Sequence, residues 1–157
     1  MFVSNILDAL IIGAGFAALY QLHSLRKLGY SCKVVEEAGG MGGVWYWNNY
    51  PGARVDTHIP IYEFDFDSPP KDFTWTERFA GRSDLLRYFG YLDQKLDLSK
   101  DVVLNTRITR AEFDTNTSRW NATMSTGYSC NCKFLMLCTG ALTKLFILDF
   151  KGINSYK

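Results

Sequence analysis

The sequence predicts an α/β fold in which a parallel sheet begins with a βαβ unit and a three-stranded antiparallel meander follows. Three observations indicate this architecture. An apolar strand at 9–12 passes through a glycine turn into a helix, and a second apolar strand follows that helix at 31–35. Short strand-like segments separated by turn residues then occupy 110–133. A chain of 157 residues is long enough to bury one real core, so we expect one compact domain.

The glycine turn between the first strand and the first helix has the pattern Gly-x-Gly-x-x-Ala, formed by Gly13, Gly15 and Ala18. Gly13 permits a tight turn, Gly15 lets a phosphate approach the backbone, and Ala18 lets helix and strand touch. A helix that begins at about Phe16 points free N–H groups and the positive end of its dipole at the turn. The pattern therefore favours a pyrophosphate site, although an ordinary strand-to-helix turn has the same glycines.

The second predicted strand ends in two carboxylates, Glu36 and Glu37. The helix before it carries apolar residues at helical spacing and ends at Gly29. Glu36 follows Gly13 by 23 residues, about the spacing at which an acidic residue accepts hydrogen bonds from the ribose of a bound dinucleotide. Alone, Glu36 reads as a solvated charge at a strand end. Combined with the glycine turn, it indicates a dinucleotide site.

A segment rich in glycine and aromatic residues follows at 39–56 and shows neither helical nor strand periodicity. Four of the five residues at 39–43 are glycines, which allow unusual backbone conformations and close approach to a ligand. The aromatic content argues against disorder, so we expect a shaped, functional loop.

The rest of the chain supplies one more helix and the remaining strands. Pro69-Pro70 ends any regular element, Ser83 is the expected N-cap of an amphipathic helix that reaches Leu96, and Asp84 lies in its first turn. Strands are expected at 102–104, in a meander at 110–114, 119–125 and 128–133, and separately at 134–138. The last, a continuous apolar run, is typical of a parallel strand covered on both faces, and Gly140 after it would let backbone meet a ligand.

The composition excludes several classes of partner. A net charge of +1 gives no electrostatic reason to bind nucleic acid or an anionic membrane. The apolar run that ends at Phe150 contains Lys144 and Asp149 and is too short to span a membrane, so a cytoplasmic protein is expected. The four cysteines lack the spacing of a zinc or redox site, which indicates reduced, buried thiols and no metal.

The motifs in the loop after Glu36 resemble those of one family. The chain is similar to the N-terminal part of the class B flavoprotein monooxygenases, in particular Baeyer–Villiger monooxygenases of the cyclohexanone and phenylacetone type. The most specific stretches are 42–48 (GGVWYWN), 50–54 (YPGAR) and 56–57 (DT), supported by 75–79, 96–98, 105–107 and 139–140. The sequence departs from the family pattern at 49, 58–59, 138 and 144–146, none of which touches the phosphate turn or Glu36.

The resemblance implies a Rossmann-like FAD-binding domain and a role for each matching residue. Gly13, Gly15 and the helix start at Phe16 would hold the pyrophosphate, Glu36 the adenosine ribose, and Ile108 the adenine through its backbone. The residues expected around the ribityl chain and the flavin are Val44, Trp45, Tyr46, Trp47, Asp56 and Tyr62. The segment expected to face a nicotinamide cofactor is Arg54, Val55 and Asp56. Core packing is the alternative for the three consecutive aromatic residues at 45–47.

In the family, NADPH and O2 are used to insert oxygen next to a ketone carbonyl on an FAD enzyme. The family's NADP domain, its second glycine motif and the C-terminal half of its FAD domain would all lie after Lys157. We therefore expect residues 1–157 to be the N-terminal part of an FAD-binding domain, a truncated or split enzyme that is inactive alone. Its catalytic residues are unknown. NADPH and a small ketone would be ligands of the completed enzyme.

Two other hypotheses stay open at the level of sequence. The chain could be a non-catalytic remnant or interaction module that keeps the fold, with a second chain or an oligomer covering an exposed sheet edge. It could also be a small NAD-dependent dehydrogenase, for which Glu36 is equally suitable. The loop at 39–56 and the absence of a Tyr-x-x-x-Lys pair speak against the dehydrogenase.

Overall fold

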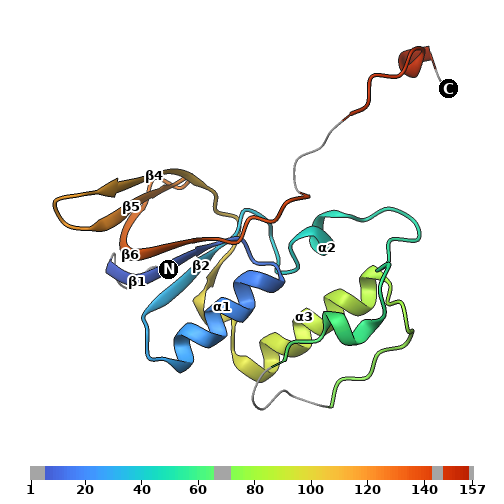
Figure 1. Cartoon of the computed structure of the whole chain (residues 1–157), viewed down its shortest axis with the longest axis horizontal. Helices are drawn as coiled ribbons and strands as arrows, with labels where there is room; N and C mark the ends of the chain where they lie inside the picture. Colours follow the sequence, from blue (N-terminus) through green and yellow to red (C-terminus); the bar gives the residue numbers. More distant parts are fainter. Residues whose placement is uncertain (1–5, 66–71, 143–146, 156–157) are drawn as a thin grey trace.

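The computed structural model describes residues 6–65, 72–142 and 147–155, which form one mixed sheet and helices packed on it (Figure 1). The six strands lie in the order β3-β2-β1-β6-β5-β4. β1 pairs in parallel with β2 and β6, β2 pairs in parallel with β3, and the pairs β4–β5 and β5–β6 are antiparallel. The predicted α/β class, the βαβ start and the three-stranded meander are all confirmed.

The βαβ unit consists of β1 (Ile6–Ile12), α1 (Phe16–Lys27) and β2 (Cys32–Val35). Leu19, Leu22 and Leu25 of α1 face the sheet and are buried, as their helical spacing predicts. Leu28 follows the helix and is exposed, because the chain leaves the helix at Gly29 with a positive φ of 81°.

One face of the sheet is covered by α1 and by α3 (Arg82–Leu96), which lie on the same side in Figure 1. Ala9 and Ile11 of β1 share a buried cluster with the apolar stripes of both helices, including Phe89 and Leu92 of α3. Burying such side chains contributes about 1.5–3 kcal/mol each. This packing fixes the N-terminal end of α1 relative to β1.

The meander of β4 (Ile108–Asp114), β5 (Arg119–Met124) and β6 (Ser129–Leu137) continues the same sheet beyond β1, and its strands contribute apolar side chains to the other face. Leu7 and Leu10 of β1 form a second buried cluster there with Ala122, Met124, Cys130 and Cys132. The cysteines are free, and burial raises the pKa of the Cys130 thiol to about 11. The prediction of buried thiols is thus confirmed for Cys32, Cys130 and Cys132, whereas Cys138 is half-buried.

The prediction of two separate strands at 128–133 and 134–138 is wrong, because β6 runs through both without interruption. Its first half pairs with β5 while residues 131–137 pair with β1, and no turn residue intervenes at Lys133 and Phe134. Coverage on both faces is also not found. Phe134 is 51% exposed and Leu137 is 69% exposed in the described part of the chain.

Smaller differences concern the ends of elements. α3 begins at Arg82 with Gly81 in the N-cap position, so Ser83 lies inside the helix. The helix starts earlier because the Arg82 N–H donates to Ala53 O at 2.9 Å, while Asp84 of the first turn accepts a hydrogen bond from Thr76 N at 3.2 Å. β3 is short (Val102–Val103). The segment at 39–56 is irregular except for α2 (Val44–Trp47), and Pro69-Pro70 and 144–146 lie outside the described residues.

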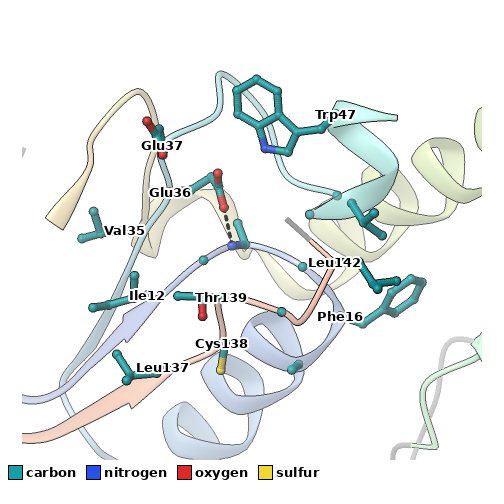
Figure 2. Close-up of a pocket in the computed structure, with 18 of the residues that line it drawn as sticks. Ile12, Phe16, Val35, Glu36, Glu37, Trp47, Leu137, Cys138, Thr139 and Leu142 are labelled. Carbon is teal, nitrogen blue, oxygen red and sulfur yellow. Dashed lines mark hydrogen bonds between the residues drawn. The ribbon is translucent and has the colours of Figure 1, made fainter. Parts of the chain in front are cut away.

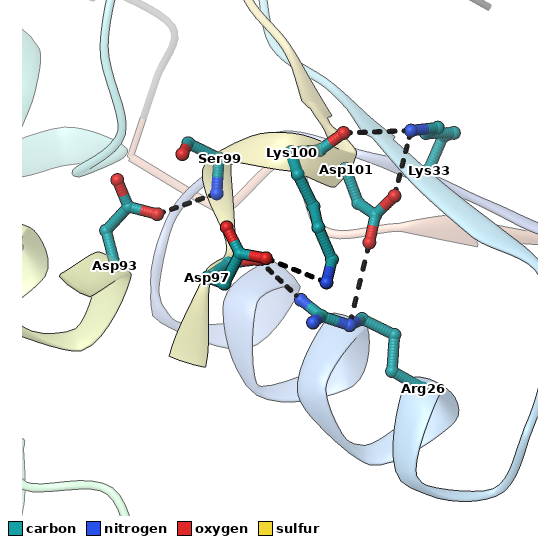
Figure 3. Close-up of polar contacts among 7 residues, drawn as sticks. All are labelled: Arg26, Lys33, Asp93, Asp97, Ser99, Lys100 and Asp101. Carbon is teal, nitrogen blue, oxygen red and sulfur yellow. Dashed lines mark hydrogen bonds and ion pairs between the residues drawn. The ribbon is translucent and has the colours of Figure 1, made fainter. Parts of the chain in front are cut away.

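Three 3-10 turns complete the described elements: η1 (Ile59–Tyr62), η2 (Ser99–Asp101) and η3 (Ile153–Ser155). η2 is tied to the end of α1 and to β2 by charged side chains (Figure 3). Arg26 donates to Asp97 O at 2.8 Å and approaches Asp101 at 3.5 Å, while Lys33 contacts the other oxygen of Asp101 at 2.8 Å. These contacts lie at the C-terminal end of α1, away from the glycine turn.

Asp8 ties β1 to its neighbours on both sides and makes the stability of the sheet dependent on pH. Its Oδ2 accepts hydrogen bonds from Ser31 N (3.0 Å) and Ser31 Oγ (2.7 Å), and Lys133 Nζ donates to Oδ1 at 3.2 Å. The Ser31 bonds, followed by Lys133, lower the pKa of Asp8 from 3.8 to about 2. A carboxylate whose pKa is lowered on folding stabilises the fold above its unfolded pKa and loses that effect as pH falls toward its folded pKa.

We expect D8N to lower the free energy of unfolding at pH 7. The gap between the two proteins should close as the pH falls from about 4 toward about 2, because the wild-type carboxylate is then protonated as well. Urea unfolding at a series of pH values measures the gap. A gap that stays constant across this pH range would show that the charge of Asp8 has no part in the effect.

Candidate functional site

The glycine turn lies where β1 meets α1, at the carboxyl edge of the parallel strands. Gly13 N donates to Val35 O at 2.8 Å, and Gly13 has a φ of +101°, which side chains rarely adopt. A Cβ on Gly13 would lie 2.5 Å from Cys138 O. The close contact of β1 with the end of β6 therefore needs a glycine at this position. Gly15 then takes the N-cap position of α1, whose first N–H groups face the turn.

Glu36 is buried beside this turn, with 7% of its surface exposed. Its Oε2 accepts a hydrogen bond from Ala14 N at 2.6 Å, shown as a dashed line in Figure 2. Its Oε1 accepts one from Ala38 N at 2.7 Å. The carboxylate thus joins the glycine turn to the loop after β2, and each oxygen keeps a lone pair for a further donor.

The loop at 39–43 is pressed against the glycine turn from the other side. Gly42 N donates to Ala14 O at 2.9 Å. A Cβ on Gly43 would lie 2.9 Å from the Cα of Gly15, so the two backbones meet at glycines on both sides. α2 begins directly after this contact and places Trp47 over the site, as Figure 2 shows.

The remaining walls come from the end of β6 and from the approach to β4. Leu137, Thr139 and Leu142, at and after the end of β6, and Thr106 and Arg107, just before β4, are among the lining residues. Together with the glycine turn, Glu36 and α2, they enclose a cleft of about 620 Å³, which we call the edge cleft (Figure 2). Cys138 also borders it, and its side chain packs against the α1 cluster; burial raises the pKa of this thiol.

The structure brings nine of the fourteen predicted binding residues together in this cleft. The residues that line it are Gly13, Gly15, Phe16, Glu36, Val44, Trp45, Trp47, Ile108 and Gly140. They come from five separate segments of the chain, which meet because parallel strands end at the same edge of the sheet.

The other five predicted residues lie outside the lining of the edge cleft. Tyr46 packs against the glycines of its own loop: a Cβ on Gly40 would lie 2.7 Å from its ring. Val55 is buried in a separate apolar cluster, and Arg54 forms an ion pair with Glu77 at 2.9 Å. Asp56 is exposed. Tyr62 contacts two lining residues edge-on, with ring centroids 5.8 Å from Phe16 and 6.2 Å from Trp45.

Sequence reasoning missed Thr106 and Arg107 as lining residues. The backbone explains their position: Asn105 N donates to Ala38 O at 3.0 Å and Thr106 N donates to Glu36 O at 2.9 Å. This segment therefore extends the pairing of β2 and β3 beyond their ends. Arg107 also faces Glu37 at 3.6 Å, and both side chains are exposed. The sequence offered two signals for this segment: 105–107 is one of the stretches that resemble the family, and it directly precedes Ile108.

The edge cleft offers an anionic ligand backbone dipoles rather than positively charged side chains. Arg107 is the one lysine or arginine among its lining residues, and it lies at the Glu37 end. An anion over Gly13 and Gly15 would therefore be held by backbone N–H groups and the dipole of α1. Within the described ranges, no three His, Cys, Asp or Glu side chains gather as a metal-binding group. None of the described helices combines the length and apolar character that a membrane crossing needs.

Strand, glycine turn, helix and the carboxylate on the next strand define a Rossmann-like dinucleotide-binding domain. A model of the NAD(P)-binding Rossmann-like domain matches residues 11–73. Cyclopentanone 1,2-monooxygenase of Comamonas sp. is 41% identical over 155 residues, which are 99% of this chain and 28% of that protein. A Baeyer–Villiger monooxygenase of Pseudooceanicola batsensis is 33% identical over 96% of this chain and 28% of its own length.

The solved structures that resemble this chain include proteins of the same kind as the sequence relatives. The crystal structure of OTEMO in complex with FAD and NADP matches with a TM-score of 0.87 and 35% identity, over 96% of this chain and 29% of that one. The chain is therefore similar, over nearly its whole length, to the N-terminal part of FAD-binding, Baeyer–Villiger monooxygenases, which confirms the resemblance seen in its motifs. It spans little more than a quarter of the length of the relatives it matches.

Proposed function

We propose that this chain binds FAD in the edge cleft. The observation that carries the proposal is the position of Glu36, whose carboxylate is hydrogen-bonded to the glycine turn itself. A ribose held by Glu36 would lie next to a pyrophosphate held by Gly13, Gly15 and the start of α1. The relatives are FAD-binding monooxygenases, and the related OTEMO structure contains FAD and NADP.

The two halves of FAD would occupy opposite ends of the cleft. The adenosine half fits between Glu36 and the segment at 106–108, where Ile108 would meet the adenine through its backbone. The flavin half would pass from Gly15 toward Val44, Trp47 and Leu142. We propose that Asp56 and Tyr62 lie near the flavin, behind the residues that line the cleft. We also propose that Arg54, Val55 and Asp56 face a nicotinamide cofactor.

The larger activity is a proposal drawn from the relatives. Bound FAD would supply two-electron transfer from NADPH and reactivity with O2, used to insert oxygen next to a ketone carbonyl. The residues described here would bind and orient the flavin and keep water from its surroundings. We propose that residues 1–157 form the N-terminal part of an FAD-binding domain and do not turn over substrate alone, since no second glycine motif of the Gly13 type occurs in the sequence.

Titration of the purified chain with FAD tests the proposal. We expect FAD and ADP to raise the melting temperature, because a ligand that binds only the folded state stabilises it by about 2.7 kcal/mol at 100 times its Kd. FAD, unlike ADP, should also quench the emission of Trp45 and Trp47, which line the flavin end. FMN, which lacks the adenosine half, and NAD, the ligand of a dehydrogenase, are the comparison ligands. Absence of both stabilisation and quenching at saturating FAD would disprove the proposal.

A second candidate function is a folded interaction module without catalysis. It is favoured by exposed apolar side chains on the free part of the sheet face and beyond β6, among them Phe134, Leu137 and Leu142. Such a module would associate with itself or with a second chain. Light scattering coupled to size exclusion distinguishes the two candidates: a monomer loaded with flavin speaks for the cofactor domain, and a flavin-free oligomer speaks for the module.

A further inference from the structure

Arg82 holds the end of the short helix that forms one wall of the edge cleft. Its Nε donates to Trp45 O at 2.8 Å and its Nη2 donates to Tyr46 O at 2.9 Å, and both contacts are partly buried. Arg82 belongs to α3, 36 residues further along the chain than Tyr46. The contact therefore joins two elements that no sequence motif connects.

α2 needs such support because it is only four residues long. A helix of this length cannot satisfy its last carbonyl groups internally, and short helices are unstable in water without tertiary contacts. The guanidinium supplies two donors in a fixed geometry to the carbonyls at the negative end of α2. Leu86, one turn further along α3, supports the start of the wall, since a Cβ on Gly42 would lie 2.9 Å from its Cδ2.

The position of Arg82 in its own helix also indicates a role outside that helix. It is the first residue of α3, where the helix dipole disfavours a positive charge. Gly81 precedes it without any side-chain cap. The positive charge of Arg82 is therefore unfavourable for α3. It is favourable for α2, because the guanidinium donates hydrogen bonds to the carbonyls of that helix.

The wall that Arg82 supports lies on one side of the proposed pyrophosphate position. α2 begins where Gly43 contacts Gly15, and it carries Val44, Trp45 and Trp47 along the cleft. The carboxylate of Glu36, by contrast, accepts its hydrogen bonds from Ala14 N and Ala38 N, neither of which belongs to α2 or α3. A change at Arg82 should therefore act on the flavin end of the cleft and leave the adenosine end intact.

We propose that Arg82 is a positioning residue for the flavin half of the cofactor, acting through the backbone of α2. The inference rests on the proposed FAD site. It predicts that replacing Arg82 lowers the affinity for FAD and leaves the affinity for ADP unchanged. General unfolding or loosening of the domain would instead weaken both ligands together.

The test compares FAD and ADP binding to the wild-type chain and to R82A, R82K and R26A, by calorimetry for both ligands and by tryptophan quenching for FAD. R26A is the matched control, because Arg26 also donates to a backbone carbonyl, at 2.8 Å, but at the far end of α1 (Figure 3). We expect R82A to weaken FAD at least about tenfold, with ADP unchanged within about twofold. R82K, which keeps a donor for one carbonyl, should bind FAD with intermediate affinity.

Equal losses for FAD and ADP in R82A, no loss for either, or FAD binding by R82K no better than by R82A would overturn the inference. So would a selective loss of FAD affinity in R26A. If R82A does not fold, the comparison of R82K with the wild type decides, and unchanged FAD affinity in R82K then counts against Arg82. A wild-type chain that binds neither FAD nor ADP refutes the proposed function instead, so the two failures are distinguishable.

Discussion

G13A is expected to abolish FAD binding and to destabilise the chain by about 2–5 kcal/mol. Two costs add: roughly 1–2 kcal/mol for a side chain with positive φ, and roughly 1–3 kcal/mol for displacing packed atoms. The displaced atoms are backbone, since the new Cβ would lie 2.5 Å from Cys138 O. β1 and β6 would have to separate at the edge where the ligand binds.

G29A is the control for this substitution. Gly29 also has a positive φ, +81°, but a Cβ there would meet nothing within 4 Å. Only the backbone cost remains, so we expect a loss of about 1 kcal/mol and unchanged FAD affinity. Thermal unfolding followed by circular dichroism and FAD titration measure both effects. If G13A and G29A lose similar stability, the contact with β6 is not what requires a glycine at position 13.

E36Q is expected to lower the affinities for both FAD and ADP by a factor of about ten to a hundred. Its loss of stability should be smaller than that of G13A. An amide keeps one acceptor oxygen, so its NH2 group must face either Ala14 N or Ala38 N, and a buried donor left without a partner costs about 1–3 kcal/mol. The negative charge that strengthens hydrogen bonds from ribose hydroxyls is lost as well. Because Glu36 serves the adenosine half, both ligands should weaken together, unlike the selective effect expected at Arg82.

E37Q is the matched control. Glu37 is the next residue, but its side chain is exposed, and its contact with Arg107 at 3.6 Å is a surface ion pair. Such pairs contribute about 0–1 kcal/mol, so neither stability nor affinity should change much. Equilibrium urea unfolding and calorimetric titration measure the two quantities. Equal affinity losses in E36Q and E37Q would point to the net charge of the cleft rather than to the hydrogen bonds of Glu36.

The parts of the site that residue spacing alone predicted, without the family resemblance, are those in which local chemistry determines position. Gly13, Gly15 and Glu36 follow from a spacing that one βαβ unit imposes, since strand, turn and helix lengths together bring the carboxylate to the turn. The helix stripe of α1 and the meander were predictable for the same reason. Each depends on residues close in sequence and on a clear periodicity.

The parts that sequence reasoning missed or misplaced depend on contacts that no local pattern reveals. Tyr46 faces its own loop while Trp47 faces the cleft, a choice that a four-residue helix cannot reveal by periodicity. Ser83 is a good N-cap by type, but the hydrogen bond between Arg82 and Ala53 starts the helix earlier. Arg82 itself carries no motif. Its role is visible only once α3 is packed beneath α2.

The continuous strand β6 also determines when the edge cleft can form during folding. Ile12 of β1 pairs with Leu137 of β6, so the two sides of the cleft come from opposite ends of the described sequence. Contacts at such large sequence separation carry a high entropic cost of loop closure and form late. A growing chain could build β1, α1 and β2 early, yet the binding site would stay open until β6 had left the ribosome and aligned with both of its neighbours.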